Sequence, residues 1–329
     1  MKKLLKKTFK IVVPLLFGGA IMVWVYRDFD FSKARQVLLH EMNWWWMLFS
    51  LVFGVFSHIF RGWRWKQTLE PLGAYPKTSN CVNAIFASYA ANLLVPRLGE
   101  VSRCGILSRY DGISFSRLLG TVVTERLIDS LCIGLATAVA VSMQMKVFRA
   151  FFKETGTNMD SITDVFTSPH FYIILCCLIG MILLLYFLVR ALSFFEKVKG
   201  VALNIWAGII SLKDVRNKAL FVCYTFLIWF CYFMQFYMTF FCFDFTASLT
   251  VPAGLVMFVG GSIAVMVPTP NGAGPWHFAV ISMMTLYGVS AVDAGIFALV
   301  VHGIQTFLII LLGIYGSVTL PIINKKHNL

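Results

Sequence analysis

Two stretches of the chain decide its fold. Residues 81–99 read CVNAIFASYAANLLVPRLG, and residues 251–274 read VPAGLVMFVGGSIAVMVPTPNGAG. Each begins as an apolar run that ends at a proline, Pro96 in the first and Pro268 in the second. A helix needs about 20 apolar residues to cross about 30 Å of hydrocarbon, and both runs are shorter than this. Because proline and glycine then interrupt the helix, we expect each stretch to enter a membrane and turn back.

The composition agrees with a membrane protein. Hydrophobic residues make up 59% of the chain and charged residues only 13%, with a mean hydropathy of +0.78. So few charges cannot cover the surface of a soluble domain or keep a chain disordered. The apolar runs are too long for the alternating strands of a membrane barrel. The eight Cys residues are scattered and include no CxxC pair, which argues against a disulfide framework, a metal site or a redox pair.

The predicted fold class is therefore all-α: a polytopic membrane helix bundle with two re-entrant broken helices in an inverted-repeat arrangement. The apolar runs that form its spans and half-spans are Ile11–Tyr26, Trp44–Phe60, Cys81–Val95, Leu118–Met143, Phe171–Val189, Leu220–Phe241, Val251–Val267, Trp276–Tyr287 and Ala294–Val318. No small-residue cleavage site follows the first run, so we expect an uncleaved span and not a signal peptide.

The basic residues predict the orientation of the bundle. The net charge of +13 comes from clusters of Lys and Arg that lie between the apolar runs. If the two broken segments dip in from opposite faces, most of the 28 Lys and Arg residues, including Arg61 and Arg64, fall on one side. The positive-inside rule then places both termini in the cytoplasm, in a multi-pass protein of the cell inner membrane. Because the charge follows this pattern, we expect no nucleic-acid partner.

The sequence predicts a single transmembrane domain over residues 1–329, organised in four parts. Residues 1–43 hold an N-terminal basic segment and the first span, and residues 44–190 form a first half with the re-entrant segment 81–110. Residues 191–218 have apolar positions at three- and four-residue spacing, as in a cytoplasmic amphipathic linker helix. Residues 219–329 form a second half with the re-entrant segment 251–288.

The two halves resemble each other. In both, a half-helix that ends in Val-Pro precedes a glycine-containing turn, a Gly-Ile-Ser or Gly-Val-Ser sequence (Gly112 and Gly288), and a long span. Each long span carries an unexpected polar residue, Glu125 in the first and His302 in the second. Ser114 and Ser290 are expected to cap these spans. Inverted repeats with broken helices that meet near the midplane are a recurring transporter plan.

The densest group of polar residues is Asn92-Leu-Leu-Val-Pro-Arg-Leu-Gly-Glu-Val-Ser-Arg103. Arg97 and Arg103 offer fork-shaped donors suited to a phosphate. Glu100 is either their internal partner or a cation or proton site. The helix that begins after Gly99 would point its positive end into the protein, which favours an anionic head group. A structural turn with neutralised charges is the competing interpretation.

A second group lies inside the span 118–143. Glu125 and Asp129 are four residues apart and share a helix face, whereas Arg126 lies about 100° away. Each charge at the centre of a membrane helix costs about 2.5–3.5 kcal/mol, so it persists only if it is paired or faces a polar cavity. The group is thus either part of a transport path or a structural ion network with Arg97 or Arg103.

The third group follows the second half-helix and reads Pro268-Thr-Pro-Asn-Gly-Ala-Gly-Pro-Trp-His277. Irregular backbone at membrane depth is tolerated only where it lines a cavity or is buried in protein. Asn271, His277 and His302 are therefore candidates for the second half of a site. The two histidines either titrate or donate to a phosphate, or they are structural groups in a packed bundle. The segment lacks the lysine of a nucleotide-binding loop.

These motifs resemble the lysylphosphatidylglycerol synthase transmembrane-region family, which comprises flippase-like integral membrane proteins. The resemblance is carried by the Asn92–Arg103 motif, by Gly112-Ile-Ser-Phe-Ser-Arg-Leu-Leu, by Thr-Glu125-Arg126-Leu-Ile-Asp129 and by the Pro268 segment with Gly288-Val-Ser. It implies movement of a lipid between leaflets. Family members usually carry an acidic residue at position 277, glycine at 271 and often arginine at 302. Because the soluble synthase domain is missing, we expect no aminoacyl-lipid synthesis.

The sequence therefore predicts a lipid transporter and not an enzyme, with no cofactor and no metal. Its partner would be an anionic phospholipid or a polyprenyl-linked lipid, and the sequence is compatible with a homo-oligomer. Two alternatives stay open: a non-transporting structural subunit of a membrane-envelope synthesis complex, and a membrane-embedded transferase that acts on a lipid phosphate. The substrate-binding candidates are Asn92, Arg97, Glu100, Arg103, Glu125, Arg126, Asp129, Asn271, His277 and His302.

Overall fold

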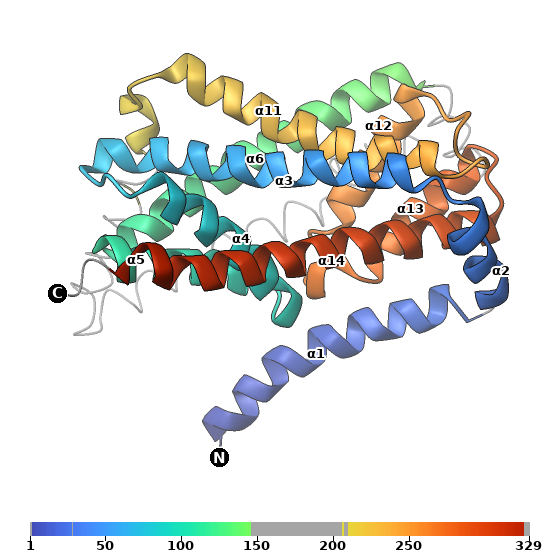
Figure 1. The fold of residues 1–329 in the computed structure, drawn as a ribbon, viewed down its shortest axis with the longest axis horizontal. Helices are drawn as coiled ribbons and strands as arrows, with labels where there is room; N and C mark the ends of the chain where they lie inside the picture. Colours follow the sequence, from blue (N-terminus) through green and yellow to red (C-terminus); the bar gives the residue numbers. More distant parts are fainter. Residues whose placement is uncertain (1, 28, 146–205, 207–209, 326–329) are drawn as a thin grey trace, which may run out of the picture.

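The computed structural model describes residues 2–27, 29–145, 206 and 210–325, and the elements in these ranges are all helical (Figure 1). The α-helices are α1 (Lys2–Val25), α2 (Phe31–Gln36), α3 (Trp44–Leu69), α4 (Thr78–Leu94), α5 (Leu98–Asp111), α6 (Phe115–Met143), α11 (Lys218–Tyr237), α12 (Val251–Ala264), α13 (Pro275–Leu286) and α14 (Ala291–Ile323). Short helical turns are η1 (Val37–Glu41), η2 (Glu70–Leu72), η3 (Ser211–Asp214), η4 (Met238–Cys242) and η5 (Pro270–Gly272).

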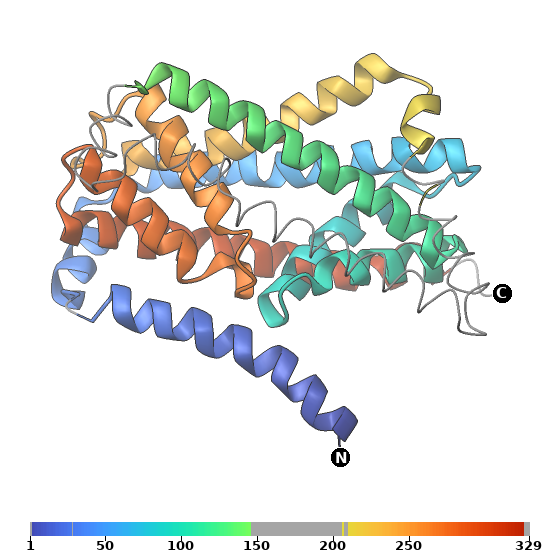
Figure 2. The same ribbon diagram turned by 180° about the vertical axis from the view of Figure 1, so that it is seen from behind.

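Four of the described helical segments are long and apolar enough to cross a membrane: α3 with η2, α6, α11 with η4, and α14. They lie roughly along one direction, and α6 and α14 run in opposite senses (Figure 1, Figure 2). The shorter apolar part of α1 is Val12–Val25, and α1 contacts α13 and η5 of the bundle. The chain is therefore a multi-pass membrane protein. The predicted span Phe171–Val189 lies outside the described residues, as do residues 191–205 and 207–209 of the predicted linker 191–218.

Two helical hairpins fill the space between the long helices. The first consists of α4 and α5, and the second of α12 and α13. They start at opposite ends of the bundle, and their turns lie next to each other near its middle (Figure 1, Figure 2). Contact between α4 and η5, the turn of the second hairpin, brings them together. The helix breaks predicted at Pro96 and Pro268 thus fall in the two turns.

Each turn contains a non-glycine residue in the left-handed region directly after a proline. Arg97 follows Pro96 with φ of 64°, and Asn271 follows Pro270 with φ of 50°. This backbone conformation costs most L-residues about 1–2 kcal/mol, and Asn tolerates it better than Arg. Pro96 and Pro270 therefore hold the same position relative to the left-handed residue of their turns. The sequence motif had paired Pro96 with Pro268, which lies two residues before Pro270.

The helices after the hairpins begin differently. Ser290 caps α14 as predicted, because its hydroxyl oxygen accepts a hydrogen bond from the Asp293 amide at 3.1 Å. The same prediction for Ser114 is wrong, since its side chain makes no cap bond to α6 and instead pairs with the Ser116 hydroxyl at 3.0 Å.

Close packing of small residues holds the first hairpin in place. Gly99 on α5 lies against the Ser88 carbonyl of α4, where a Cβ would collide with that oxygen. A Cβ on Gly313 of α14 would collide with the Ala90 Cβ of α4, and a Cβ on Gly316 would lie too close to the Asn83 carbonyl. Because these crossings leave no room for a side chain on α14, α4 packs tightly against that helix.

Candidate functional site

Asp129 of α6 lies between two arginines that project from α3. Its Oδ2 is 2.9 Å from Arg61 Nη1, and its Oδ1 is 3.0 Å from Arg64 Nη2. Arg61 and Arg64 are three residues apart and therefore share one face of α3. Both arginine side chains are buried. The two helices are thus joined in the span by a carboxylate that accepts from two guanidinium groups.

Glu125, one turn before Asp129, is fully buried and lies between α3 and α5. Its Oε2 is 2.6 Å from Arg103 Nη1 of α5, and its Oε1 is 3.6 Å from Arg64 Nη2. The Arg103 guanidinium also lies over the Trp65 ring at 4.6 Å. The Trp65 indole donates to the Thr121 hydroxyl at 3.0 Å. The carboxylates thus share a helix face as predicted, and α5 is tied to the spanning helices through Arg103.

We call these five residues the charged cluster: Arg61, Arg64, Arg103, Glu125 and Asp129. It contains three guanidinium groups and two carboxylates, so it carries one positive charge in excess. Both terminal nitrogens of Arg103 and both oxygens of Glu125 lack hydrogen-bond geometry to any described partner, despite their short separation. A buried charge is tolerated only when other charges and hydrogen bonds compensate it. The cluster therefore carries an excess positive charge at a buried position.

A second ion pair flanks the cluster nearer to the surface. Arg126 Nε is 2.9 Å from Glu100 Oε1, and Arg126 Nη1 is 3.8 Å from Asp129 Oδ2. The side chains of Arg126 and Glu100 are 46% and 31% exposed, whereas that of Asp129 is 8% exposed. Charged groups therefore lead from the outer face of α5 and α6 to the buried cluster.

Arg97 lies apart from this network. It is exposed at the turn of the first hairpin and forms no ion pair within the part of the chain that the structure describes. Of the two partners considered for Glu125, Arg103 is the one that pairs with it. Asn92, the other candidate near the turn, accepts a hydrogen bond from the Gly99 amide at 2.8 Å. Asn92 thus fastens α4 to the first turn of α5.

Hydrogen bonds extend the cluster toward the middle of the bundle. Arg61 Nε donates to the Tyr232 hydroxyl of α11 at 3.2 Å, and that hydroxyl is 2.7 Å from the Tyr89 hydroxyl of α4. The Tyr89 ring packs against buried His58 with centroids 4.2 Å apart. The cluster is therefore linked to the inner part of the first hairpin by two phenols.

Uncharged polar side chains join the second hairpin to α14. We call them the neutral cluster, which consists of Asn271 and His277 of the hairpin and His302 and Thr306 of α14. Its two imidazole rings have centroids 4.5 Å apart. His302 Nε2 lies 3.1 Å from the Asn271 carbonyl oxygen, and the Asn271 amide donates to the Thr306 hydroxyl at 2.8 Å. His277 Nδ1 lies 3.4 Å from the Gly274 amide. In the described residues, no hydrogen bond or ion pair joins the neutral cluster to the charged one.

The structure adds two residues that the sequence analysis assigned elsewhere. Arg61 and Arg64 follow the apolar run that ends at Phe60, so they were counted as cytoplasmic loop charges. Helix α3 instead continues to Leu69 and buries both of them. Their three-residue spacing, on the same face as His58 and Thr68, was the signal available in the sequence.

Comparison with known proteins agrees with the motifs described above. No curated protein and no solved structure matches the chain. The family model described as the lysylphosphatidylglycerol synthase TM region matches residues 11–313. The chain therefore belongs to the lysylphosphatidylglycerol synthase transmembrane-region family.

Proposed function

We propose that this protein moves an anionic phospholipid or a polyprenyl-linked lipid between the leaflets of the cell inner membrane, as a transporter and not as an enzyme. The observation that carries the proposal is the excess positive charge of the charged cluster, which is buried among membrane-spanning helices. Ionisable groups at this depth are costly and generally belong to substrate or ion pathways. A lipid phosphate would balance the excess positive charge and accept hydrogen bonds from the arginines of the cluster.

The exposure of the charged groups supports a route for the head group. Arg97 is exposed at the hairpin turn, Arg126 and Glu100 are partly exposed, and the charged cluster is closed. Exposed leucines border this route on α6 (Leu127, Leu131 and Leu135) and near the turn (Leu94 and Leu98). In the proposed mechanism the phosphate exchanges between arginines, while the acyl chains stay against these leucines in the bilayer. Opening the cluster would require the Arg103–Glu125 ion pair between α5 and α6 to separate.

The proposal includes a topology. The two hairpins are re-entrant segments of an inverted repeat, and they enter from opposite membrane faces with both termini in the cytoplasm. The opposite senses of α6 and α14 and the neighbouring hairpin turns support it. Since the sequence has no nucleotide-binding motif, ion gradients or mass action would drive the movement.

A vesicle assay tests this proposal. The purified protein is reconstituted with fluorescent phosphatidylglycerol, and a membrane-impermeant quencher measures how fast the label appears in the outer leaflet. The test variant is Arg97→Asn, because Asn keeps the left-handed turn and removes only the charge. We expect it to slow translocation at least about tenfold, as loss of one charge-assisted contact of about 1.5–3 kcal/mol would.

The matched control is Arg109→Asn, which removes an exposed arginine from the other end of the same hairpin. It should translocate phosphatidylglycerol at the wild-type rate. If Arg97→Asn also retains that rate at equal protein content, the proposed route is wrong. Vesicles without protein give the background rate.

The closed state of the charged cluster also favours the second function, a structural subunit of an envelope-synthesis complex. Glu125 and Arg64 are fully buried, as expected of a clamp between helices. In that case Arg97→Asn would leave lipid movement unchanged, whereas Glu125→Gln would reduce co-purification with partners at equal amounts of folded protein.

A further inference from the structure

Two phenols and an imidazole lie beside the charged cluster. They belong to Tyr89 of α4, Tyr232 of α11 and His58 of α3, and α4 and α11 both pack against α3. We call these three residues the phenol–imidazole group. Arg61 connects the group to the charged cluster, because its Nε donates to the Tyr232 hydroxyl at 3.2 Å. A head group bound by the cluster would therefore have these hydrogen-bonding side chains next to it.

The two phenols carry one proton more than their hydrogen bonds use. Their hydroxyls are 2.7 Å apart and share one hydrogen bond. Because Arg61 donates to Tyr232, the bonds form a continuous chain when Tyr232 in turn donates to Tyr89, and hydrogen bonds in such a chain strengthen one another. Neither hydroxyl forms a further hydrogen bond within the described residues. The Tyr89 proton at the end of the chain can therefore be donated to a ligand.

His58 supplies a second group without a partner, next to the end of this chain. The residue is only 5% exposed, and its Nδ1 forms no hydrogen bond to any residue that the structure describes. Its ring centroid is 4.2 Å from that of Tyr89 and 6.2 Å from that of Tyr232. A buried polar atom without a hydrogen bond costs about 1–3 kcal/mol, so such an atom calls for an explanation.

We propose that Tyr89 and His58 bind a hydroxyl on the head group of the lipid whose phosphate the charged cluster holds. This inference rests on the proposed function and names the substrate class as lipids that carry a glycerol or a sugar beside the phosphate. A hydroxyl has one donor and two acceptor positions. It can accept from the Tyr89 phenol and, in either tautomer of His58, form the hydrogen bond that Nδ1 lacks.

The division of roles follows from the chemistry of the two parts of the head group. An ionised phosphate only accepts hydrogen bonds, so it suits the arginines of the charged cluster. In phosphatidylglycerol the free hydroxyls lie within a few bonds of the phosphate. Tyr89 and Tyr232 are partly exposed, so the end of the hydrogen-bond chain is not sealed by packing. The arginines would thus select the charge, and Tyr89 and His58 would select the hydroxyl.

A lipid without a free hydroxyl separates this role from a structural one. The vesicle assay compares acyl-labelled phosphatidylglycerol with acyl-labelled phosphatidylmethanol, which has the same phosphate charge and no hydroxyl. Phosphatidylinositol, with a ring of hydroxyls, is the third lipid. The variants are Tyr89→Phe and His58→Phe, which remove the polar atoms and keep a ring. The matched control is Tyr237→Phe on α11, because the Tyr237 hydroxyl donates to the Leu249 carbonyl at 3.4 Å.

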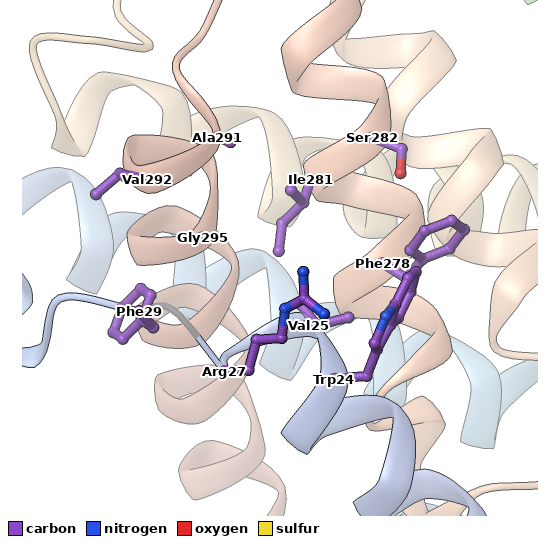
Figure 3. Close-up of a pocket in the computed structure, with 10 residues that line it drawn as sticks. All are labelled: Trp24, Val25, Arg27, Phe29, Phe278, Ile281, Ser282, Ala291, Val292 and Gly295. Carbon is purple, nitrogen blue, oxygen red and sulfur yellow. The ribbon is translucent and has the colours of Figure 1, made fainter.

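A pocket elsewhere in the chain provides a second control. It has a volume of about 370 Å³ and lies between the C-terminal end of α1, α13 and the start of α14 (Figure 3). Its described lining includes no residue of the charged cluster or of the phenol–imidazole group. Ser282→Ala removes a hydroxyl from its wall (Figure 3). This variant tests whether a preference for one lipid arises in the pocket instead.

Rates are compared at equal amounts of folded protein. We expect the wild type to move phosphatidylglycerol at least about fivefold faster than phosphatidylmethanol, as one or two hydrogen bonds would give. Tyr89→Phe and His58→Phe should bring this ratio close to one, whereas Tyr237→Phe and Ser282→Ala should keep it. Equal rates in the wild type, an unchanged ratio in Tyr89→Phe and His58→Phe, or a lost ratio in either control would overturn the proposal. Faster movement of phosphatidylinositol than of phosphatidylglycerol would support it and assign the group to a ring-shaped polyol.

A binding measurement distinguishes failure of this inference from failure of the proposed transport. Native mass spectrometry in detergent gives the affinity of the same proteins for the same lipids. If the wild type moves no lipid faster than protein-free vesicles, transport is wrong. The hydroxyl site is then supported by at least about fivefold tighter binding of phosphatidylglycerol than of phosphatidylmethanol that Tyr89→Phe and His58→Phe abolish, and it is overturned by equal binding. If the wild type moves and binds both lipids equally, only the hydroxyl site is wrong.

Discussion

The two hairpins have the same backbone plan, but different kinds of side chain attach them to the membrane spans. Both have a helix, a proline, a left-handed non-glycine residue and a second helix, and a long membrane span follows each. The first hairpin is attached to its spans through the charged cluster, by way of Arg103 and Glu125. The second is attached through the neutral cluster, by way of Asn271 and His302.

This difference distinguishes the backbone geometry that a hairpin turn requires from the role of the side chains that attach the hairpin. The backbone plan is shared, so it reflects the geometry needed to reverse a helix inside the bundle. Buried charges are not needed for that, because the second hairpin is held by hydrophobic packing and by the hydrogen bonds of the neutral cluster. The hairpin geometry therefore does not account for the buried charges, and the proposed function rests on them.

The largest expected effect comes from uncoupling the charged cluster. Glu125→Gln leaves Arg103 without its buried counter-charge and leaves Arg64 with Asp129 alone, and breaking such a buried pair typically costs about 3–5 kcal/mol. His302→Gln in the neutral cluster removes a hydrogen bond and should cost about 1–2 kcal/mol. Unfolding free energies in mixed micelles measure both. Similar losses in the two variants would contradict the distinction between the clusters.

The double variant Arg103→Gln with Glu125→Gln sharpens this test. Both partners of the ion pair are then neutral, so its loss of stability should be smaller than the sum of the two single losses. Additive losses would mean that Arg103 and Glu125 do not act as a pair.

The next largest effect on stability is expected where the two helices of each hairpin pack against each other. In Gly99→Ala the new Cβ would collide with the Ser88 carbonyl, and backbone cannot move aside. In Gly261→Ala of the second hairpin the Cβ would meet the Trp276 side chain at 2.8 Å, which can shift. We expect a loss of about 2–3 kcal/mol for the first and less for the second, measured by thermal unfolding. Gly105→Ala on α5, where a Cβ meets nothing within 4 Å, is the control.

A smaller effect of opposite sign is expected at the two turns. Arg97→Gly relieves a left-handed arginine, worth about 1–2 kcal/mol, against about 0.5–1 kcal/mol for the added chain entropy of glycine. A net gain of about 0.5 kcal/mol should follow. Asn271→Gly loses the hydrogen bond to Thr306 and should cost about 1 kcal/mol. The same sign for both variants, in denaturant unfolding, would contradict the difference expected between the two turns.

The smallest effect is expected at the surface pair of Lys33 and Asp293, next to the second hairpin. The hydrogen bond to Asp293 raises the pKa of Lys33 above its ordinary value of 10.5. A raised pKa in the folded state means that the stabilisation is present below pH 10.5 and is lost as the pH rises through the folded pKa. Lys33→Gln should lower stability by only a few tenths of a kcal/mol, and high salt should remove the difference.

The membrane class, the helix breaks and the shared face of Glu125 and Asp129 could be predicted from the sequence alone. These are local properties: hydropathy measures affinity for lipid, proline removes a helical hydrogen bond, and a four-residue spacing fixes a face. The cap at Ser290 belongs to the same group, although Ser114 made a different local bond.

Which charged side chains contact one another depends on the tertiary structure. Arg61 and Arg64 belong to the charged cluster because α3 extends past its apolar run and packs beside α6. Arg97 stays outside the cluster because it lies exposed at the hairpin turn, and the two histidines meet because α13 packs against α14. Such partners are far apart along the chain, and side-chain pairing at that range depends on how whole helices pack, which no local pattern encodes.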